Sequence, residues 1–303
     1  PFEDALTTLS SHISETMHSS AKVSMYRKCY VVSEGWLVPA FMIHFTTNES
    51  SYEAFVGKMD IFSTHKMEFH TTRSAKAIAF DVNPNNGEIE QDINVNKSGY
   101  LQNQNFQTFT NLVPRVTSTQ ELRDGKTIYI FQTSDGNISQ KGEINIFVHV
   151  NKAYEYFQTL GYTNTNGVVD LELNVTINNS LNNAVYKPTP ATGRPRISIS
   201  NGDGIILQNL TFDSDVISHE FGHHTLWRTI KSTIGEALVL HEGLADFFTF
   251  SAQGDSCLGE SVCPTNSNFC WYKSQCLRSA DNDMQYLDAT YNAIDPHMKG
   301  QIV

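Results

Sequence analysis

The sequence predicts an α+β protein, and three patterns in it support this fold class. Residues 4–20 carry apolar side chains at helical spacing, and the chain then changes to short β-rich runs. Residues 168–177 alternate strictly between apolar and polar side chains, which is typical of a half-buried strand. Helical spacing returns after Asp213. Since a chain of 303 residues suggests about two domains, we expect a first domain over residues 1–75 and a second over residues 76–303.

The first domain is expected to consist of one helix and a small antiparallel sheet. The apolar residues of the helix share one face, and they are Ala5, Leu6, Leu9, Ile13 and Met17. Three strands are predicted after it, over residues 23–32, 35–45 and 52–62, with polar turns at residues 33–35 and 47–50.

The second domain is expected to begin with strands and long loops over residues 76–140. A helix follows over residues 143–160, and Gly161 is suited to cap its C-terminus. After the alternating strand at residues 168–177, residues 201–212 predict a turn and a short strand that lead into the next helix.

Composition and charge narrow the possible partners. Acidic residues outnumber basic ones by 32 to 21, which gives a formal net charge of −11. Because Lys and Arg form no cluster that would attract a phosphate backbone, we expect no nucleic acid partner. No apolar run approaches the roughly 18 to 20 residues that span a bilayer, so we expect no membrane span. The first residues do not resemble a secretory signal, so any signal peptide is expected to be already absent.

Four of the five cysteines lie close together, at Cys257, Cys263, Cys270 and Cys276. Their spacings do not match the C-x2-4-C pairs of structural zinc sites, so we expect two disulfides and a free, buried Cys29 in the first domain. Disulfides indicate an oxidising compartment, and a secreted or extracellular protein is expected, with a periplasmic one as the alternative.

The segment that starts at Asp213 carries the first part of a metal-binding motif, DSDVISHEFGHHTLWRTI. His219 and His223 are four residues apart on a predicted helix, so their side chains project side by side. Two imidazoles at this spacing can reach one zinc ion at about 2.0 to 2.1 Å, and Glu220 then points towards the open position where water binds. His224 and His241 are expected to have packing or supporting roles.

The second part of the motif lies on another predicted helix. The residues from Thr233 to Glu236 suit a capping box at its start. Glu242 and Asp246 are four residues apart, so Glu242 can complete a three-ligand zinc site and Asp246 can accept the free N–H of a ligand histidine. Three protein ligands leave the fourth position for water, which indicates a catalytic zinc. The alternative is a pair of ordinary histidines beside an unrelated acidic helix.

The motifs HEFGH and E-G-x-x-D-F resemble those of the thermolysin-like gluzincin metallopeptidases, and the second is closer to the fungalysin branch. This resemblance implies a zinc-dependent endopeptidase in which Glu220 is the general base. The sequence NNAVY followed by NGDG resembles the edge strand that holds the peptide substrate in this family, which implies that Asn183 and Ala184 bind its backbone. The runs GWLVPAF and YEAFVGKMD resemble the family's propeptides. The first domain would then be an intramolecular inhibitor that keeps the enzyme latent until a cut between Thr71 and Ala77.

The family also uses a late histidine to stabilise the oxyanion, and DPHMKGQIV offers His297 in a similar setting. The tyrosine that the family places between the two zinc helices has no counterpart between His223 and Glu242. In the family a helical subdomain follows, so this chain is expected to be truncated there and His297 to lie on a poorly ordered tail.

Calcium sites recur in the resembled family, and a second metal is therefore expected as a possibility. Oxygen ligands could come from five aspartates, which are Asp203, Asp213, Asp215, Asp281 and Asp283. Asp215 precedes the first zinc histidine, as an acidic residue does in the family.

Two other functions remain open. The phrase LHEGLADFF also resembles gluzincin aminopeptidases, although the G-x-M-E-N segment of those enzymes does not occur here. A non-catalytic binding or inhibitory protein on a protease-like fold is the other alternative, and an intact Glu220 argues against it.

Overall fold

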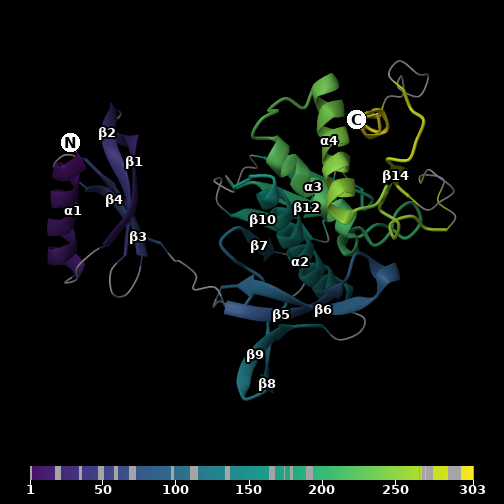
Figure 1. Ribbon diagram of the computed structural model, residues 1–303, viewed down its shortest axis with the longest axis horizontal. Coiled ribbons are helices and arrows are strands. Elements are labelled where there is room, and N and C mark those ends of the chain that lie inside the picture. Colours follow the sequence, from purple (N-terminus) through teal and green to yellow (C-terminus); the bar gives the residue numbers. More distant parts are fainter. Residues whose placement is uncertain are drawn as a thin grey trace. The chain divides into compact units, whose positions relative to one another are not determined.

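The structure is a computed structural model that combines helices and sheets, which confirms the α+β fold class (Figure 1). Its described residues are 2–17, 22–33, 36–46, 51–57, 61–67, 73–96, 99–109, 115–133, 137–163, 168–173, 175–177, 180–188, 194–265, 267, 270, 276–285 and 295–302. The chain divides into two compact units, Pro1–Thr71 and Thr72–Val303. Each unit has its own hydrophobic core.

The first unit is one helix packed on a four-stranded antiparallel sheet. Its elements are α1 (Phe2–Met17), β1 (Lys22–Ser33), β2 (Trp36–Thr46), β3 (Ser51–Val56) and β4 (Ile61–Met67), and the strand order is β1-β2-β3-β4. The core between helix and sheet consists of Ala5, Leu9, Ile13, Ile43, Ala54 and Val56.

The sheet has one strand more than the sequence predicts. The run over residues 52–62 is not a single strand, because the chain leaves β3 after Val56 and returns at Ile61 as β4, antiparallel to β3. The interruption is short and has apolar residues on both sides, so the run looked continuous in the sequence.

The second unit contains two four-stranded sheets. The first has the order β6-β5-β9-β8, with β5 parallel to β9 and the other neighbours antiparallel. Its strands are β5 (Arg73–Phe80), β6 (Glu88–Val95), β8 (Thr119–Arg123) and β9 (Lys126–Phe131), with the short helix η1 (Pro84–Asn86) between the first two.

The second sheet has the order β11-β12-β10-β7, so β11 is an edge strand. Its strands are β7 (Phe106–Phe109), β10 (Val169–Leu173), β11 (Ala184–Lys187) and β12 (Arg196–Ile199). β11 is antiparallel to β12, and β10 is parallel to both of its neighbours, β12 and β7. The sequence predicts that one face of β10 is exposed, but Asp170 on that face is buried. Its Oδ1 accepts a hydrogen bond from Nε2 of Gln107 on β7 at 2.6 Å.

The second unit has three long helices, namely α2 (Ile138–Thr159), α3 (Ser214–Leu226) and α4 (Glu236–Gln253) (Figure 1). α2 and α3 pack against the sheets, and α4 packs on α3. The remaining elements are η2 (Leu210–Phe212), β13 (Cys257–Leu258), β14 (Arg278–Ser279) and α5 (Pro296–Gly300). As predicted, α2 ends at a glycine in the left-handed region, since Gly161 has a φ of 88°. Among the described helices, none is both long enough and apolar enough to cross a membrane.

An aromatic cluster fixes α3 on α2. The ring of Phe221 on α3 lies 5.7 Å from that of Phe157 and 6.2 Å from that of Tyr154, both on α2, with edge-to-face geometry. Such pairs add to the free energy gained from burial. The helix with the predicted metal ligands is therefore anchored in the core of the second unit.

Three local predictions are wrong. Residues 201–212 form a turn and η2 rather than a strand, because Gly202 and Gly204 both have positive φ and break the extended backbone. No capping box starts α4, since its N-cap is Gly235 with a φ of 60° and without a side-chain bond. His297 is not on a poorly ordered tail, because α5 packs against α4.

Candidate metal centre

α3 places two imidazoles side by side at the middle of the helix. Its first turn is capped by Asp213, whose carboxylate accepts a hydrogen bond from the backbone N–H of Asp215 at 3.1 Å. One turn further, the Nε2 atoms of His219 and His223 lie 3.1 Å apart. Two nitrogens at this distance can share one ion.

Glu242 on α4 provides a third donor at the same point. Its Oε2 lies 3.2 Å from Nε2 of His219 and 3.3 Å from Nε2 of His223. This oxygen is buried and makes no well-aligned hydrogen bond within the described part of the chain. A tetrahedral site with bonds of about 2.0 to 2.1 Å has edges of about 3.3 Å. The three spacings therefore fit the edges of a zinc tetrahedron.

The close approach of α3 and α4 depends on Gly222. A Cβ atom at this position would lie 3.1 Å from the Cα and 3.2 Å from the Cβ of Ala245, which is tighter than ordinary packing. Gly222 lies next to His223, so the small residue lets the two helices bring their donors together.

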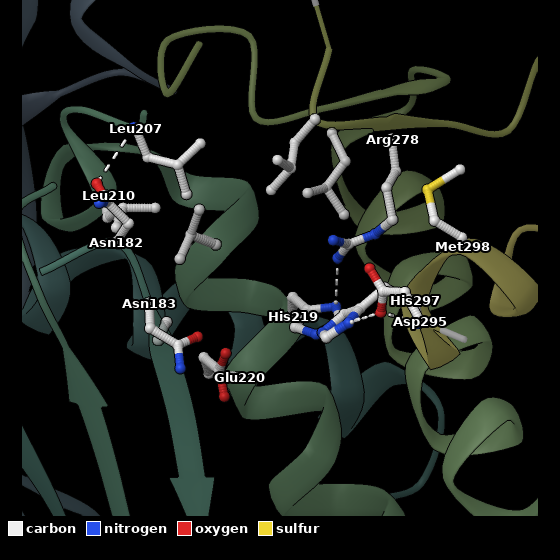
Figure 2. A pocket seen from close by; sticks show the side chains of 14 residues that line it. Asn182, Asn183, Leu207, Leu210, His219, Glu220, Arg278, Asp295, His297 and Met298 are labelled. Carbon is white, nitrogen blue, oxygen red and sulfur yellow. Dashed lines mark hydrogen bonds and ion pairs between the residues drawn. The ribbon is translucent and has the colours of Figure 1, made fainter. Parts of the chain in front are cut away.

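Asp246 and Arg278 hold the other nitrogen of the first histidine. Nδ1 of His219 lies 2.7 Å from Oδ1 of Asp246, whose two oxygens also accept hydrogen bonds from Nε and Nη2 of Arg278 at 2.5 and 2.8 Å. Figure 2 shows the Arg278 guanidinium directed towards His219. Burial alone would lower the pKa of His219, but the Asp246 carboxylate outweighs it and raises the pKa to about 10. Arg278 is not predictable from the sequence, because it lies in a cysteine-rich segment with no periodic pattern.

Glu220 is buried beside the two histidines. Its Oε2 has no hydrogen-bond partner among the described residues. Burial raises the pKa of Glu220, and the charges of His219 and His223 oppose this effect. A buried carboxylate oxygen of this kind next to a candidate metal centre is suited to take up a proton.

His297 reaches the same centre from α5. Its Nε2 lies 3.1 Å from Oε2 of Glu242, and its Nδ1 lies 2.9 Å from Oδ1 of Asp295, which also accepts the backbone N–H of His297 at 3.0 Å. The α5 backbone is held close to α4, because a Cβ atom on Gly300 would lie 2.7 Å from the backbone N of Gly243. Asp295, Gly243 and Gly300 were not identified from the sequence.

Two cavities meet at this centre. The first has a volume of about 260 Å³ and includes five aliphatic side chains, which are Leu207, Leu210, Val216, Leu258 and Leu277 (Figure 2). The second has a volume of about 370 Å³ and includes Tyr186 and Trp227. Four residues line both cavities, and they are Asn183, Ala184, Glu220 and His297. The structure thus places Asn183 and Ala184, at the start of the edge strand β11, beside Glu220.

A second group of carboxylates lies at the start of α3. Ligand oxygens of Asp213, Asp215 and Glu260 lie within 4.8 Å of one another. Oδ1 of Asp215 is buried without a hydrogen-bond partner among the described residues, while its Oδ2 accepts the backbone N–H of Gly259 at 2.9 Å. Burial raises the pKa of Asp213 to about 6, and it raises that of Asp215 well above its ordinary value. The charges in this group are therefore suited to a cation.

The other three predicted calcium ligands do not join this group. Asp203 accepts hydrogen bonds from the backbone N–H groups of Ile205 and Ile206, both at 2.8 Å, so its carboxylate shapes a turn. Asp281 and Asp283 are exposed and belong to neither cluster of metal-capable side chains found in the described residues.

Two disulfides join the four clustered cysteines, as predicted. Cys257 pairs with Cys276, and Cys263 pairs with Cys270 inside that loop. The prediction of a free, buried Cys29 concerns a side chain outside those that the structure describes.

His224 and His241 have partners away from the centre. Nδ1 of His224 lies 3.1 Å from the hydroxyl of Tyr186, and Nε2 of His241 lies 2.6 Å from the carbonyl oxygen of Ile230. Both rings are buried, and burial lowers the pKa of His224 to about 4. These contacts are those of packing and supporting residues.

A match to a family model identifies the family of this chain. The family model described as thermolysin metallopeptidase, catalytic domain, matches residues 46–226, which is more than half of the chain but ends before Glu242. Among solved structures, the chain is similar to the precursor of protealysin, a metalloproteinase from Serratia proteamaculans, with 15% identity and a TM-score of 0.41. That match covers 77% of this chain, which spans 60% of the length of the other. A search of curated proteins found no match.

Proposed function

Because this chain belongs to the thermolysin family of metallopeptidases, which hydrolyse peptide bonds, we propose that it is a zinc-dependent endopeptidase. The observation that carries the proposal is the convergence of three donors, Nε2 of His219, Nε2 of His223 and Oε2 of Glu242, at spacings of 3.1 to 3.3 Å. These residues hold the zinc ion, and Asp246 orients His219 through its Nδ1–H.

Glu220 is the general base in this proposal. When bound, the zinc supplies a Lewis acid that polarises the scissile carbonyl and lowers the pKa of water. Glu220 takes a proton from the water and later donates it to the leaving amine. Its buried Oε2 has no hydrogen-bond partner among the described residues, which supports this role, because no hydrogen bond at that oxygen has to break first.

The peptide is held by the edge strand and the two cavities. We infer that its backbone pairs with β11 near Asn183 and Ala184, since an edge strand presents unpaired N–H and C=O groups. Side chains on either side of the scissile bond then enter the two cavities. The aliphatic lining of the first cavity favours an apolar side chain there.

His297 stabilises the developing oxyanion by hydrogen bonding. Asp295 accepts its Nδ1–H, so that Nε2 faces the centre. One such donor is typically worth about 3 kcal/mol in the transition state. This role requires that His297 is not a zinc ligand, so its removal should leave the metal content unchanged.

Two variants test the proposal with a quenched peptide that is blocked at both ends. Glu220→Gln should keep zinc and lose nearly all hydrolysis, because an amide cannot accept the water's proton. His223→Ala should lose both metal and activity. Zinc is measured by atomic absorption, and equal zinc loss in both variants would show that Glu220 is a ligand rather than the base. A blocked peptide also separates an endopeptidase from an aminopeptidase, since only the former cleaves it.

We also propose that Pro1–Thr71 is an inhibitory propeptide of a secreted precursor. It is a separate compact unit with its own core, as a removable domain requires. The expected cut precedes Arg73, because residues 73–77 belong to β5 and are paired with β6. Activity should rise when the cut is made, and full activity of the uncut chain would contradict this proposal. The two disulfides support an oxidising, extracellular location.

A calcium ion is proposed at Asp213, Asp215 and Glu260. The buried, unpartnered Oδ1 of Asp215 supports it, because two adjacent buried carboxylates without a cation repel one another. Calcium should raise the melting temperature of the wild-type protein, and Asp215→Asn should reduce that rise. A melting temperature independent of calcium would exclude this site.

A further inference from the structure

The loop over residues 201–208 is held in one shape by bonds at its base. Oδ1 of Asn182 accepts hydrogen bonds from the backbone N–H groups of Asp203 at 3.0 Å and Leu207 at 3.2 Å. Nδ2 of Asn182 donates to Oδ2 of Asp203 at 2.8 Å. Gly202 has a φ of 85°, and a Cβ atom there would lie 2.4 Å from the carbonyl oxygen of Leu207. The loop is therefore preorganised by Asn182 and by the glycine at position 202.

This rigid loop exposes apolar side chains at its tip. Ile205 is 75% exposed and Ile206 is 42% exposed, and we call these two residues the apolar tip. Leu181, at the base of the loop, is 47% exposed, and its carbonyl oxygen accepts the backbone N–H of Gly202 at 2.8 Å. Three large aliphatic side chains in contact with water at one place mark a binding surface rather than a packing surface.

The apolar tip directly precedes a residue of the first cavity's wall in the chain. Leu207, the next residue along the chain, lines that cavity, and so does Asn182, which clamps the loop (Figure 2). On the other side, the hydroxyl of Ser267 donates a hydrogen bond to the carbonyl oxygen of Ile206 at 2.7 Å. The apolar tip is thus joined directly to a residue of the cavity wall and is bonded to Ser267.

We propose that the apolar tip binds a second apolar side chain of the peptide substrate, beyond the one that fills the first cavity. This inference rests on the proposed peptidase function and adds a specificity determinant to it. Ile205 and Leu207 are two residues apart, so their Cα atoms are separated by at most about 7 Å. In an extended peptide, side chains two positions apart face the same way and are separated by about 6.6 Å. The peptide residue two positions beyond the cavity residue therefore meets the tip.

The experiment compares three blocked, quenched peptides on the mature protein. Two are identical except for Leu or Ser at the position that meets the tip, and the third ends at the residue that fills the cavity. The wild-type protein should prefer the Leu peptide over the Ser peptide by about tenfold or more in kcat/KM. In the double variant Ile205→Ser/Ile206→Ser, this preference should disappear through KM, while cleavage of the short peptide stays unchanged.

Matched controls keep the result interpretable. Leu122→Ser removes an equally exposed aliphatic side chain, 76% exposed on β8, and should change nothing. The double variant Ile205→Val/Ile206→Val keeps an apolar tip and should keep the preference. Equal cleavage of the Leu and Ser peptides by the wild type would overturn the inference, as would a loss that is the same for all three peptides. A tip variant that changes the oligomeric state instead would assign the tip to self-association. If the wild type cleaves no peptide, the proposed function itself fails.

Discussion

Gly300→Ala tests how α5 positions His297. The added Cβ atom would lie 2.7 Å from the backbone N of Gly243, where ordinary contact begins at 3.4 Å, so α5 must move by about 0.7 Å. His297 lies on the same five-residue helix and moves with it. Since a misplacement of 1 Å can cost about a hundredfold in rate, we expect kcat to fall by about tenfold to a hundredfold. Zinc should be retained, because the proposed ligands lie on α3 and α4.

The assay measures kcat, KM and zinc content for Gly300→Ala, His297→Ala and the double variant. If Gly300 acts through His297, the two losses should overlap and the double variant should be no slower than His297→Ala. Lys299→Ala, in the same helix, adds no Cβ atom and serves as the control. Unchanged kcat in Gly300→Ala, or a loss of zinc from it, would refute the reasoning.

Three further predictions concern stability and the walls of the site. Burial lowers the pKa of His149 to about 3, against about 6.5 in an unfolded chain, so below pH 6.5 the unfolded state binds the extra proton. As the pH is lowered from about 6 to 4, the free energy of unfolding should then fall by up to about 1.4 kcal/mol per pH unit. His149→Gln should reduce this dependence on pH, as measured by urea titrations at each pH. The double variant Cys257→Ser/Cys276→Ser should raise KM and lower the melting temperature, because that disulfide closes the segment that leads to Arg278. Arg278→Met should weaken zinc binding by about tenfold to a hundredfold in a competition titration with a chelator, and an unchanged affinity would show that Asp246 needs no such support.

The donors on α3 and α4 were predictable because their spacing is local. His219 and His223, like Glu242 and Asp246, are four residues apart, and helix geometry places such pairs on one face. The two helix segments also carry the motifs that resemble those of the thermolysin-like metallopeptidases. Arg278 could not be found in this way, since it follows Asp246 by 32 residues in a segment without periodicity. Tertiary structure alone brings it to the carboxylate.

The wrong prediction about the segment around His297, which forms α5, has a different cause. The sequence predicts a poorly ordered tail around His297, because terminal residues with nothing to dock against are poorly ordered. The stability of α5 comes from docking, and docking depends on the approach of Gly300 to the backbone of Gly243. Two glycines so far apart in the sequence give no pattern that a single sequence reveals. In contrast, Asp295 and Pro296 are ordinary helix-start residues, and they could have indicated the N-terminus of α5.

The segment over residues 257–279 links the two candidate metal sites. At its start, the backbone N–H of Gly259 bonds Asp215 in the carboxylate group at the head of α3. At its end, Arg278 bonds Asp246, which in turn holds His219. Between them, Leu258 and Leu277 line the first cavity, and the backbone N–H of Leu277 donates to the carbonyl oxygen of Leu258 at 2.8 Å. One end of this segment is bonded to α3 and the other to α4, the two helices that carry the proposed zinc ligands. A displacement of the segment at the carboxylate group would therefore move both the cavity wall and the support of His219.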